Sequence, residues 1–275
     1  MRLGWLAIAL VAFWSAAAVA RPTWDQGVLS HVESASAVPQ GVLPDGAPFP
    51  YRVRLDQPTA RYAHDILGGV PHWTRLEVEA LSCSRCRHRR TLLRAVLPDD
   101  MIFEDVMPRL WDVTGDGRAE IVVVETSLTK GARLAVWGVG GDEPRLIRIA
   151  ATRFIGRAQR WLAPVGVGDF DGDGRMEIAY VDRPHLLREL VILRLDGKTL
   201  REVARGTGFT AHRIGETVIT SAIRSCSEGQ VEILLPDGAW SQLMAVQLVK
   251  GSLQARVLGP MSSSLLQDES TKTCK

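Results

Sequence analysis

The chain has 275 residues, with 33 Lys and Arg against 31 Asp and Glu, and 46% of its residues are hydrophobic. This near balance of charge argues against a protein that binds duplex nucleic acid, because such proteins need an excess of Lys and Arg to displace counterions from phosphates. The apolar fraction is too high for an intrinsically disordered chain, and the length suffices for one large or two small hydrophobic cores.

The first twenty residues have the pattern of a secretory signal peptide. Arg2 supplies a positive charge, an apolar stretch follows, and the segment ends in Ala-Val-Ala, which predicts cleavage before Arg21. The alternative is a membrane anchor, but the apolar run is short for a bilayer span. Arg21 stands where a lipid-anchored protein would carry Cys. We therefore expect a periplasmic or secreted protein without membrane insertion after cleavage, in which residues 21–49 form a lead segment.

Four cysteines, Cys83, Cys86, Cys226 and Cys274, follow in a chain expected to be exported, which favours two disulfides. Closure of the nearest pairs predicts Cys83–Cys86 and Cys226–Cys274, although three connectivities are possible. Cys83 and Cys86 lie between two runs that resemble strands, so a hairpin tip is favoured over a redox pair or a zinc half-site with His88.

A repeat organises the second half of the chain. The segments that begin at Asp112 and Asp169 share the pattern Asp-x-x-Gly-Asp-Gly-Arg-x-Glu-Ile and lie 57 residues apart; a third copy begins at Arg224, 55 residues later. Each copy is followed by a short apolar run and then by two strand-like runs around a turn signal. These predicted hairpins span 134–150, 190–203 and 243–258.

Four strands in about fifty residues, repeated along the chain, predict an all-β fold of the propeller type. A weaker unit precedes the three copies over residues 61–98, and a further strand is expected at 50–56. We therefore expect residues 50–275 to form a small β-propeller of about four to five four-stranded blades. A solenoid is the rival architecture, and no amphipathic helix is expected after residue 25.

The acidic loops carry the clearest chemistry in the sequence. Asp169, Asp171, Asp173 and Glu177 stand at positions 1, 3, 5 and 9 of one loop, with glycines at positions 4 and 6 that allow a left-handed backbone. Four carboxylates in one tight loop would repel each other, so a hard cation is the natural partner, and Ca²⁺ fits because it accepts six to eight oxygens in flexible geometry. The carbonyl of Arg175 is the expected ligand at position 7.

The sister loop offers fewer charges, with ligand positions Asp112, Thr114, Asp116, Arg118 and Glu120. Thr114 replaces an acid, so we expect this second calcium site to be weaker. An EF-hand is excluded, because position 12 is Val123 or Tyr180 rather than Glu and because a β-type run follows each loop. Solvated Asp-Gly turns without metal are the remaining alternative.

The pattern Asp-x-Asp-Gly-Asp-Gly-x-x-Glu between strands resembles the FG-GAP and VCBS repeats of integrin alpha-chain propellers. This resemblance implies calcium in the loop between the first two strands of a blade. Arg224 and Cys226 interrupt the motif in the third copy, which argues against a site there. The segments 160–166, 178–185 and 212–215 are also similar to exported VCBS-type proteins of Gram-negative alphaproteobacteria, which implies a periplasmic location but no particular activity.

Two functions are compatible with these observations. We expect a non-enzymatic, calcium-stabilised module that binds a protein or glycan partner and no nucleic acid. The alternative is a calcium-dependent periplasmic hydrolase or lyase that acts on polysaccharide or a phosphoester, for which Asp65, Glu104 and Asp105 are the acids to inspect. His64 and His212 recur at similar points of their units, and we expect hydrogen bonds between blades rather than a catalytic or ligand role.

Overall fold

Alternating and continuous apolar runs become sixteen strands in the computed structural model, which describes residues 52–81, 90–140 and 143–274. One 3-10 turn, η1 (Ser227–Gly229), and one short helix, α1 (Ser263–Ser270), complete the described part of the chain. In chain order the strands are β1 (Arg52–Thr59), β2 (His72–Leu81), β3 (Arg90–Val96), β4 (Met101–Phe103), β5 (Arg109–Trp111), β6 (Glu120–Ser127), β7 (Gly131–Gly140), β8 (Arg145–Ala151), β9 (Leu162–Gly168), β10 (Glu177–Asp182), β11 (Glu189–Asp196), β12 (Thr199–Thr207), β13 (Ala222–Ser225), β14 (Val231–Pro236), β15 (Gln242–Val249) and β16 (Ser252–Pro260).

The strands form three antiparallel sheets. Two of them are the expected four-stranded units, β9 to β12 and β13 to β16, each with its strands in sequence order. The third is an eight-stranded sheet with the path β1-β2-β4-β6-β7-β8, in which β3 also pairs with β2 and β5 with β6. The prediction of an all-β fold built from antiparallel sheets is therefore confirmed.

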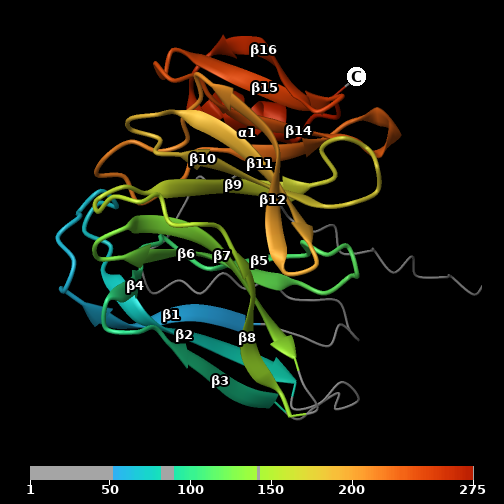
Figure 1. Cartoon of the computed structure of the whole chain (residues 1–275). Coiled ribbons are helices and arrows are strands. Elements are labelled where there is room, and N and C mark those ends of the chain that lie inside the picture. Colours follow the sequence, from blue (N-terminus) through green and yellow to red (C-terminus); the bar gives the residue numbers. More distant parts are fainter. Residues whose placement is uncertain (1–51, 82–89, 141–142, 275) are drawn as a thin grey trace, which may run out of the picture.

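The sheet units stack face to face, with one hydrophobic layer between each neighbouring pair (Figure 1). A first core, which includes Leu76 and Val123, lies between β1–β3 and β4–β8, and a larger core around Val165 and Ile192 joins β4–β8, β9–β12 and β13–β16. Strands β6, β9 and β10 are buried at every residue because both of their faces are covered. This position explains why their sequences are continuous apolar runs rather than alternations.

The three predicted hairpins are confirmed as β7–β8, β11–β12 and β15–β16. Asp196 and Gly197, and Lys250 and Gly251, lie at the tips of the second and third hairpins. Each pair contains a register shift, which marks a bulge. Local turn chemistry was therefore sufficient to place these elements.

The first two units do not form separate blades, contrary to the expectation of independent four-stranded units. Strand β4 pairs with β2 through Phe103 and Trp73 and also with β6, so it joins both units into one sheet. Residues 61–71, expected to open the first unit, contain no strand and form the connection from β1 to β2.

The sequence predicted no amphipathic helix after residue 25; the short helix α1 is present but buries only one residue. Its N-cap is Ser262, whose hydroxyl accepts a hydrogen bond from the Leu265 amide at 3.1 Å, and Leu266 is its only buried residue. With a single buried side chain the helix shows no apolar periodicity in sequence. Leu266 packs on Leu234 and Ala245, on the face of β13–β16 that points away from the larger core.

The described residues do not show a closed ring of blades. Among them, no helix is long and apolar enough to cross a membrane. The proposed signal peptide and the lead segment fall outside the part of the chain that the structure describes.

Candidate metal-binding loops

The acidic loops lie at equivalent places in successive units. The Asp169 loop joins β9 to β10, the first two strands of its unit, as expected. The Asp112 loop joins β5 to β6, and β5 forms the first edge of its unit together with β4, since both pair with β6. The third copy joins β13 to β14 through the turn η1. The recurrence of the sequence motif is therefore a recurrence of position in the fold.

Asp169 organises its loop by accepting hydrogen bonds from the backbone. One carboxylate oxygen accepts from the amides of Gly172 (2.8 Å) and Asp173 (3.1 Å), and the other accepts from Gly174 (2.9 Å). Gly172 and Gly174 have φ values of 75° and 83°. Glycine occupies this left-handed region without steric cost, so the two glycines allow the chain to wrap around the aspartate as the sequence predicted.

The structure brings together three of the four predicted acids of this loop. Ligand oxygens of Asp169, Asp171 and Asp173 all lie within 4.8 Å of one another. Glu177, the first residue of β10, is fully buried and accepts a hydrogen bond from the Phe170 amide at 2.9 Å. Arg175 donates its amide to Asp173 at 2.9 Å, and its carbonyl remains the predicted position-7 ligand. A set of hard oxygen donors of this kind suits calcium.

A basic side chain from the neighbouring strand lies against this cluster. Arg194 of β11 is opposite Glu177 in the sheet register and donates to it at 2.6 Å. The same guanidinium contacts Asp171 at 2.8 Å and Asp173 at 2.9 Å. A guanidinium is a cation, so the carboxylates have a positive partner placed where a metal ion would neutralise them. The sequence analysis did not identify Arg194.

The Asp112 loop has the same hydrogen-bond frame without that cation. Asp112 accepts from the amides of Gly115 (2.7 Å) and Gly117 (2.8 Å), and Glu120 accepts from Val113 (2.9 Å). Asp116 likewise accepts from the amide of Arg118 at 2.9 Å. Within the described residues, no Arg or Lys forms an ion pair with these acids.

Thr114 and the spread of the acids distinguish the two loops. The Thr114 hydroxyl lies 3.4 Å from an oxygen of Asp112, to which it donates. Among the described residues, the acids of this loop do not form a compact set like that of Asp169, Asp171 and Asp173. The geometry is in keeping with the expected weaker site, although binding itself stays a prediction.

Burial changes the acidity of the closing glutamates. Burial, together with the negative charges of Asp112 and Asp116, raises the pKa of Glu120 to about 7, although the hydrogen bond from the Val113 amide lowers it in part. Burial also raises the pKa of Glu177 to about 6, where the hydrogen bond from Phe170 and the Arg194 guanidinium partly offset it. A cation at either loop would stabilise the ionised form of these groups.

The third copy replaces the acid at position 1 by an arginine. Arg224 is buried and donates to the closing Glu232 at 2.8 Å, and Arg256 of β16 also contacts Glu232 at 2.9 Å. Beside this pair, Cys226 forms a disulfide with Cys274, which confirms the predicted bridge. The arginines and the disulfide hold this loop without an acidic cluster. Cys83 and Cys86 lie outside the described residues.

The histidines singled out in sequence form contacts between units. His64 contacts the buried Glu104 at 2.5 Å, and Glu104 also accepts from Thr126 at 2.8 Å. His212 contacts His185 at 2.9 Å. Trp161 connects the two pairs, since its indole N–H donates to the Glu104 carbonyl at 2.7 Å and its ring packs on both His185 and His212.

The other acids proposed for catalysis also have structural partners. Asp105 is fully buried, forms an ion pair with Arg109 at 2.8 Å and accepts from the Val124 amide at 2.8 Å. Asp65 accepts from the amide of Gly69 at 2.9 Å. Each acid is thus engaged in holding the local backbone or a neighbouring side chain.

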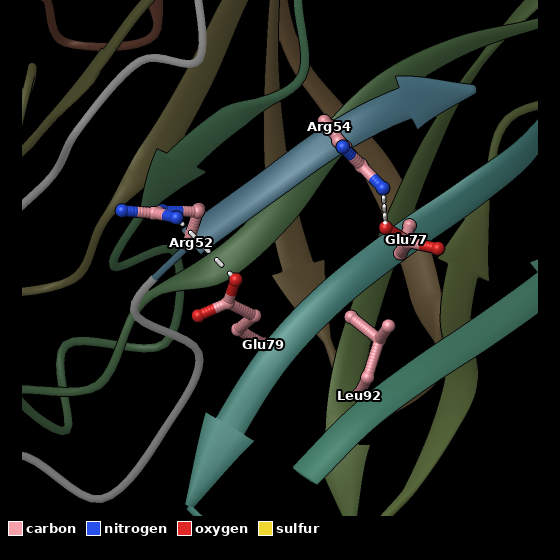
Figure 2. A pocket seen from close by; sticks show the side chains of 5 residues that line it. All are labelled: Arg52, Arg54, Glu77, Glu79 and Leu92. Carbon is pink, nitrogen blue, oxygen red and sulfur yellow. Dashed lines mark hydrogen bonds and ion pairs between the residues drawn. The ribbon is translucent and has the colours of Figure 1, made fainter. Parts of the chain in front are cut away.

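A shallow pocket of about 160 Å³ lies on the outer face of β1–β3 (Figure 2). Arg52 and Arg54 of β1 point toward Glu79 and Glu77 of β2, and Leu92 of β3 closes one side. Arg94 also donates to the buried Glu77, at 2.9 Å. The charges of this pocket are paired with each other, so it offers no isolated group for chemistry.

Comparison with known proteins supports the repeat. Residues 112–180, about a quarter of the chain, match the model of a family described as FG-GAP-like repeat. This match includes both acidic loops, so the expected resemblance to FG-GAP repeats is confirmed for that stretch. No curated protein matches the chain.

Among solved structures, the chain is similar to a crystal structure of a protein from Lactobacillus plantarum, with 13% sequence identity and a TM-score of 0.40. The similarity covers 77% of this chain and 57% of that one, so the chain spans little more than half of that protein's length.

Proposed function

We propose that the protein is an exported, calcium-binding module of the β-propeller type that binds a protein or glycan partner and has no enzymatic activity of its own. The observation that carries this proposal is the gathering of the Asp169, Asp171 and Asp173 oxygens within 4.8 Å of one another, in a loop between the first two strands of a repeated unit. The FG-GAP-like match over 112–180 supports a propeller-type module, and the proposed number of blades remains about four to five.

Calcium has a structural role in this proposal. Extracellular modules bind calcium with dissociation constants of roughly 0.1 to 1 mM. At a calcium concentration ten times the dissociation constant, one site adds about 1.4 kcal/mol to the free energy of unfolding. The Asp169 loop and the Asp112 loop are the two proposed sites, and the ligand count favours the Asp169 loop.

The proposed compartment is the periplasm or the extracellular space. The Cys226–Cys274 bridge supports it, because structural disulfides persist in oxidising compartments. The signal-peptide pattern of residues 1–20 agrees with it. We do not extend the proposal to a hydrolase or lyase, since Glu104 and Asp105 are buried in structural contacts.

Thermal unfolding with and without calcium tests the metal part of the proposal. We expect 2 mM calcium to raise the melting temperature by roughly 3–5 °C per saturated site relative to EGTA, and magnesium to raise it less. The double variant Asp116→Asn, Asp173→Asn should lose this difference. Asp196→Asn, which changes an exposed acid of a hairpin turn, should keep it. Equal melting of the wild type in calcium and EGTA would refute a calcium-stabilised module.

A protein partner can be sought by affinity capture from periplasmic extract, and a glycan partner by binding of the protein to glycan arrays. Capture that requires calcium and is lost in the Asp116→Asn, Asp173→Asn variant would identify a partner that depends on the loops. A protein that turns over polysaccharide or phosphoester substrates instead would contradict the non-enzymatic assignment.

A further inference from the structure

We infer that Arg194 is a tethered cation that competes with calcium for the Asp169 loop, so that this side chain sets the calcium affinity of the site. The inference rests on the calcium binding proposed above and adds the residue that regulates it. It would make the acid-rich loop a weaker site than its four carboxylates suggest.

The hydrogen bonds divide the carboxylates of this loop into two sets of oxygens. One oxygen each of Asp173 and Glu177 accepts from a loop amide, at 2.9 Å in both cases. The second oxygen of each faces the Arg194 guanidinium, at 2.9 Å and 2.6 Å, and Asp171 presents an oxygen to the same group at 2.8 Å. The amides therefore fix the loop, and the outward oxygens that a metal ion would need are those held by Arg194.

The position of Arg194 is set by the sheet and not by a flexible surface. Its side chain is 15% exposed, and its backbone lies opposite Glu177 in the β10–β11 register. A calcium ion that enters must share these oxygens with a guanidinium or displace it, and two cations at one cluster repel each other. Loss of the Arg194 contacts is thus part of the free energy of calcium binding.

The two other copies of the loop provide an internal comparison. In the third copy, Arg224 occupies the position of the first acid and pairs with Glu232. An arginine therefore neutralises the closing glutamate of that copy. In the Asp112 loop, the register in which Ile121 faces Trp137 places Gly138 opposite Glu120. The same sheet position therefore carries an arginine in one metal loop and no side chain in the other.

Calcium titration calorimetry of the full chain tests the inference, with Asp116→Asn present throughout to disable the Asp112 loop. Replacement of Arg194 by Gln should tighten calcium binding roughly tenfold, because repulsion between the guanidinium and the ion is removed. Arg194→Lys, which keeps a charge but cannot contact three carboxylates in the same way, should give an intermediate affinity. Arg201→Gln, an exposed arginine of β12 paired with Asp196, removes the same charge from the same sheet and should leave the affinity unchanged.

A second readout does not depend on calorimetry. In EGTA, Arg194→Gln should melt at a lower temperature than the parent, since the carboxylates lose their counterion, and calcium should restore more of the melting temperature than in the parent. Unchanged or weaker calcium binding in a folded Arg194→Gln variant would overturn the inference while leaving the proposed site intact. Absence of calcium binding in the parent and in both Arg194 variants would instead refute the proposed calcium site itself.

Discussion

At the scale of single residues, the closing glutamate of each loop shows how one position can be neutralised in different ways. Among the described residues, Glu120 has its loop hydrogen bonds and the acids beside it, Glu177 has Arg194, and Glu232 has Arg224 and Arg256. All three glutamates are buried. A buried carboxylate needs a partner to remain ionised, so the copy without an arginine would gain most from the proposed calcium ion.

Gly131, at the start of β7, provides a test of backbone constraint at a single residue. Its φ is +74°, and a Cβ atom there would lie 2.2 Å from the carbonyl oxygen of Arg157. We expect Gly131→Ala to lower the free energy of unfolding by roughly 3–5 kcal/mol, because strain in the left-handed region adds to a clash with rigid backbone.

Gly197 is the matched control, since its φ of +60° is similar but its surroundings are open. Gly197→Ala should cost only about 1–2 kcal/mol. Urea unfolding of both variants measures the difference, and an equal cost for the two would show that the Arg157 contact is relieved without penalty.

The residue pattern of the acidic loop was predictable from the sequence, but its counterion was not. Acids at positions 1, 3, 5 and 9, with glycines between them, specify the wrapped backbone through contacts within nine residues. Arg194 follows Glu177 by 17 residues and meets it only because β10 and β11 pair in one particular register. The β10–β11 pairing is regular, but a single sequence does not reveal which residues of two strands face each other.

At the scale of elements, the first edge of the β4–β8 unit consists of two short strands, β4 and β5, separated by a gap in which a side chain takes the place of the backbone. Strand β4 pairs with the end of β6 and β5 with its beginning, and Asp105 lies in the gap between them. Its carboxylate accepts a hydrogen bond from the Val124 amide, which would otherwise lack a partner in the sheet. The same carboxylate accepts two hydrogen bonds from Arg109, of 2.8 and 2.9 Å. One side chain thus substitutes for a missing stretch of strand.

Asp105→Ala tests this role. The variant leaves the buried Arg109 without its charge partner and Val124 without its acceptor, so we expect a loss of about 3–5 kcal/mol in urea unfolding. A double variant in which Arg109 is also replaced by Met should recover part of that loss. If Asp105→Ala alone is as stable as the wild type, the ion pair does not support the interrupted strand.

The hairpins of the fold could be read from local turn signals, whereas β4 could not. Lys250-Gly251 and Asp196-Gly197 are short-range signals with a direct physical meaning. A strand of three residues that pairs with two different partners has no periodicity to detect, and its pairing is decided by the packing of two cores. The helix α1 was missed for a related reason, since it buries a single leucine.

At the scale of the whole molecule, the stack of sheets has two chemically different ends. The outer face of β1–β3 is mixed and exposes Arg54 and Arg94 beside Leu92 and Val96. The outer face of β13–β16 is apolar and is covered by α1 (Figure 1). The described residues form a stack of units whose two outer faces differ in composition.

The histidine contacts between units predict a loss of stability in mild acid. Burial lowers the pKa of His185 to about 4, with the charges of His212 and His64 acting in the same direction, and burial also lowers the pKa of His212 and His72. An unfolded histidine has a pKa near 6.5. The unfolded chain therefore binds protons more readily than the folded chain, and stability should fall as the pH decreases from about 6.5 toward 4.

Melting temperatures between pH 7 and pH 4, measured in EGTA, check this prediction. His185→Gln should show a shallower decline than the wild type. Glu120 acts in the opposite sense. Its pKa is raised on folding, so it stabilises the folded state at low pH, and this contribution to stability is lost as the pH increases from about 4.5 to 7. A steeper decline in a Glu120→Gln variant would agree with this sign, and identical slopes for wild type and His185→Gln would contradict the histidine account.

The shared strand β4 also determines how the protein should come apart. Because its few backbone hydrogen bonds belong to β2 and to β6 at once, the first unit cannot detach from the second without exposing the core around Phe103 and Val123 to water. The described strands β1 to β8 should therefore open as one cooperative block in native-state hydrogen exchange, with a common opening free energy for amides on both sides of β4.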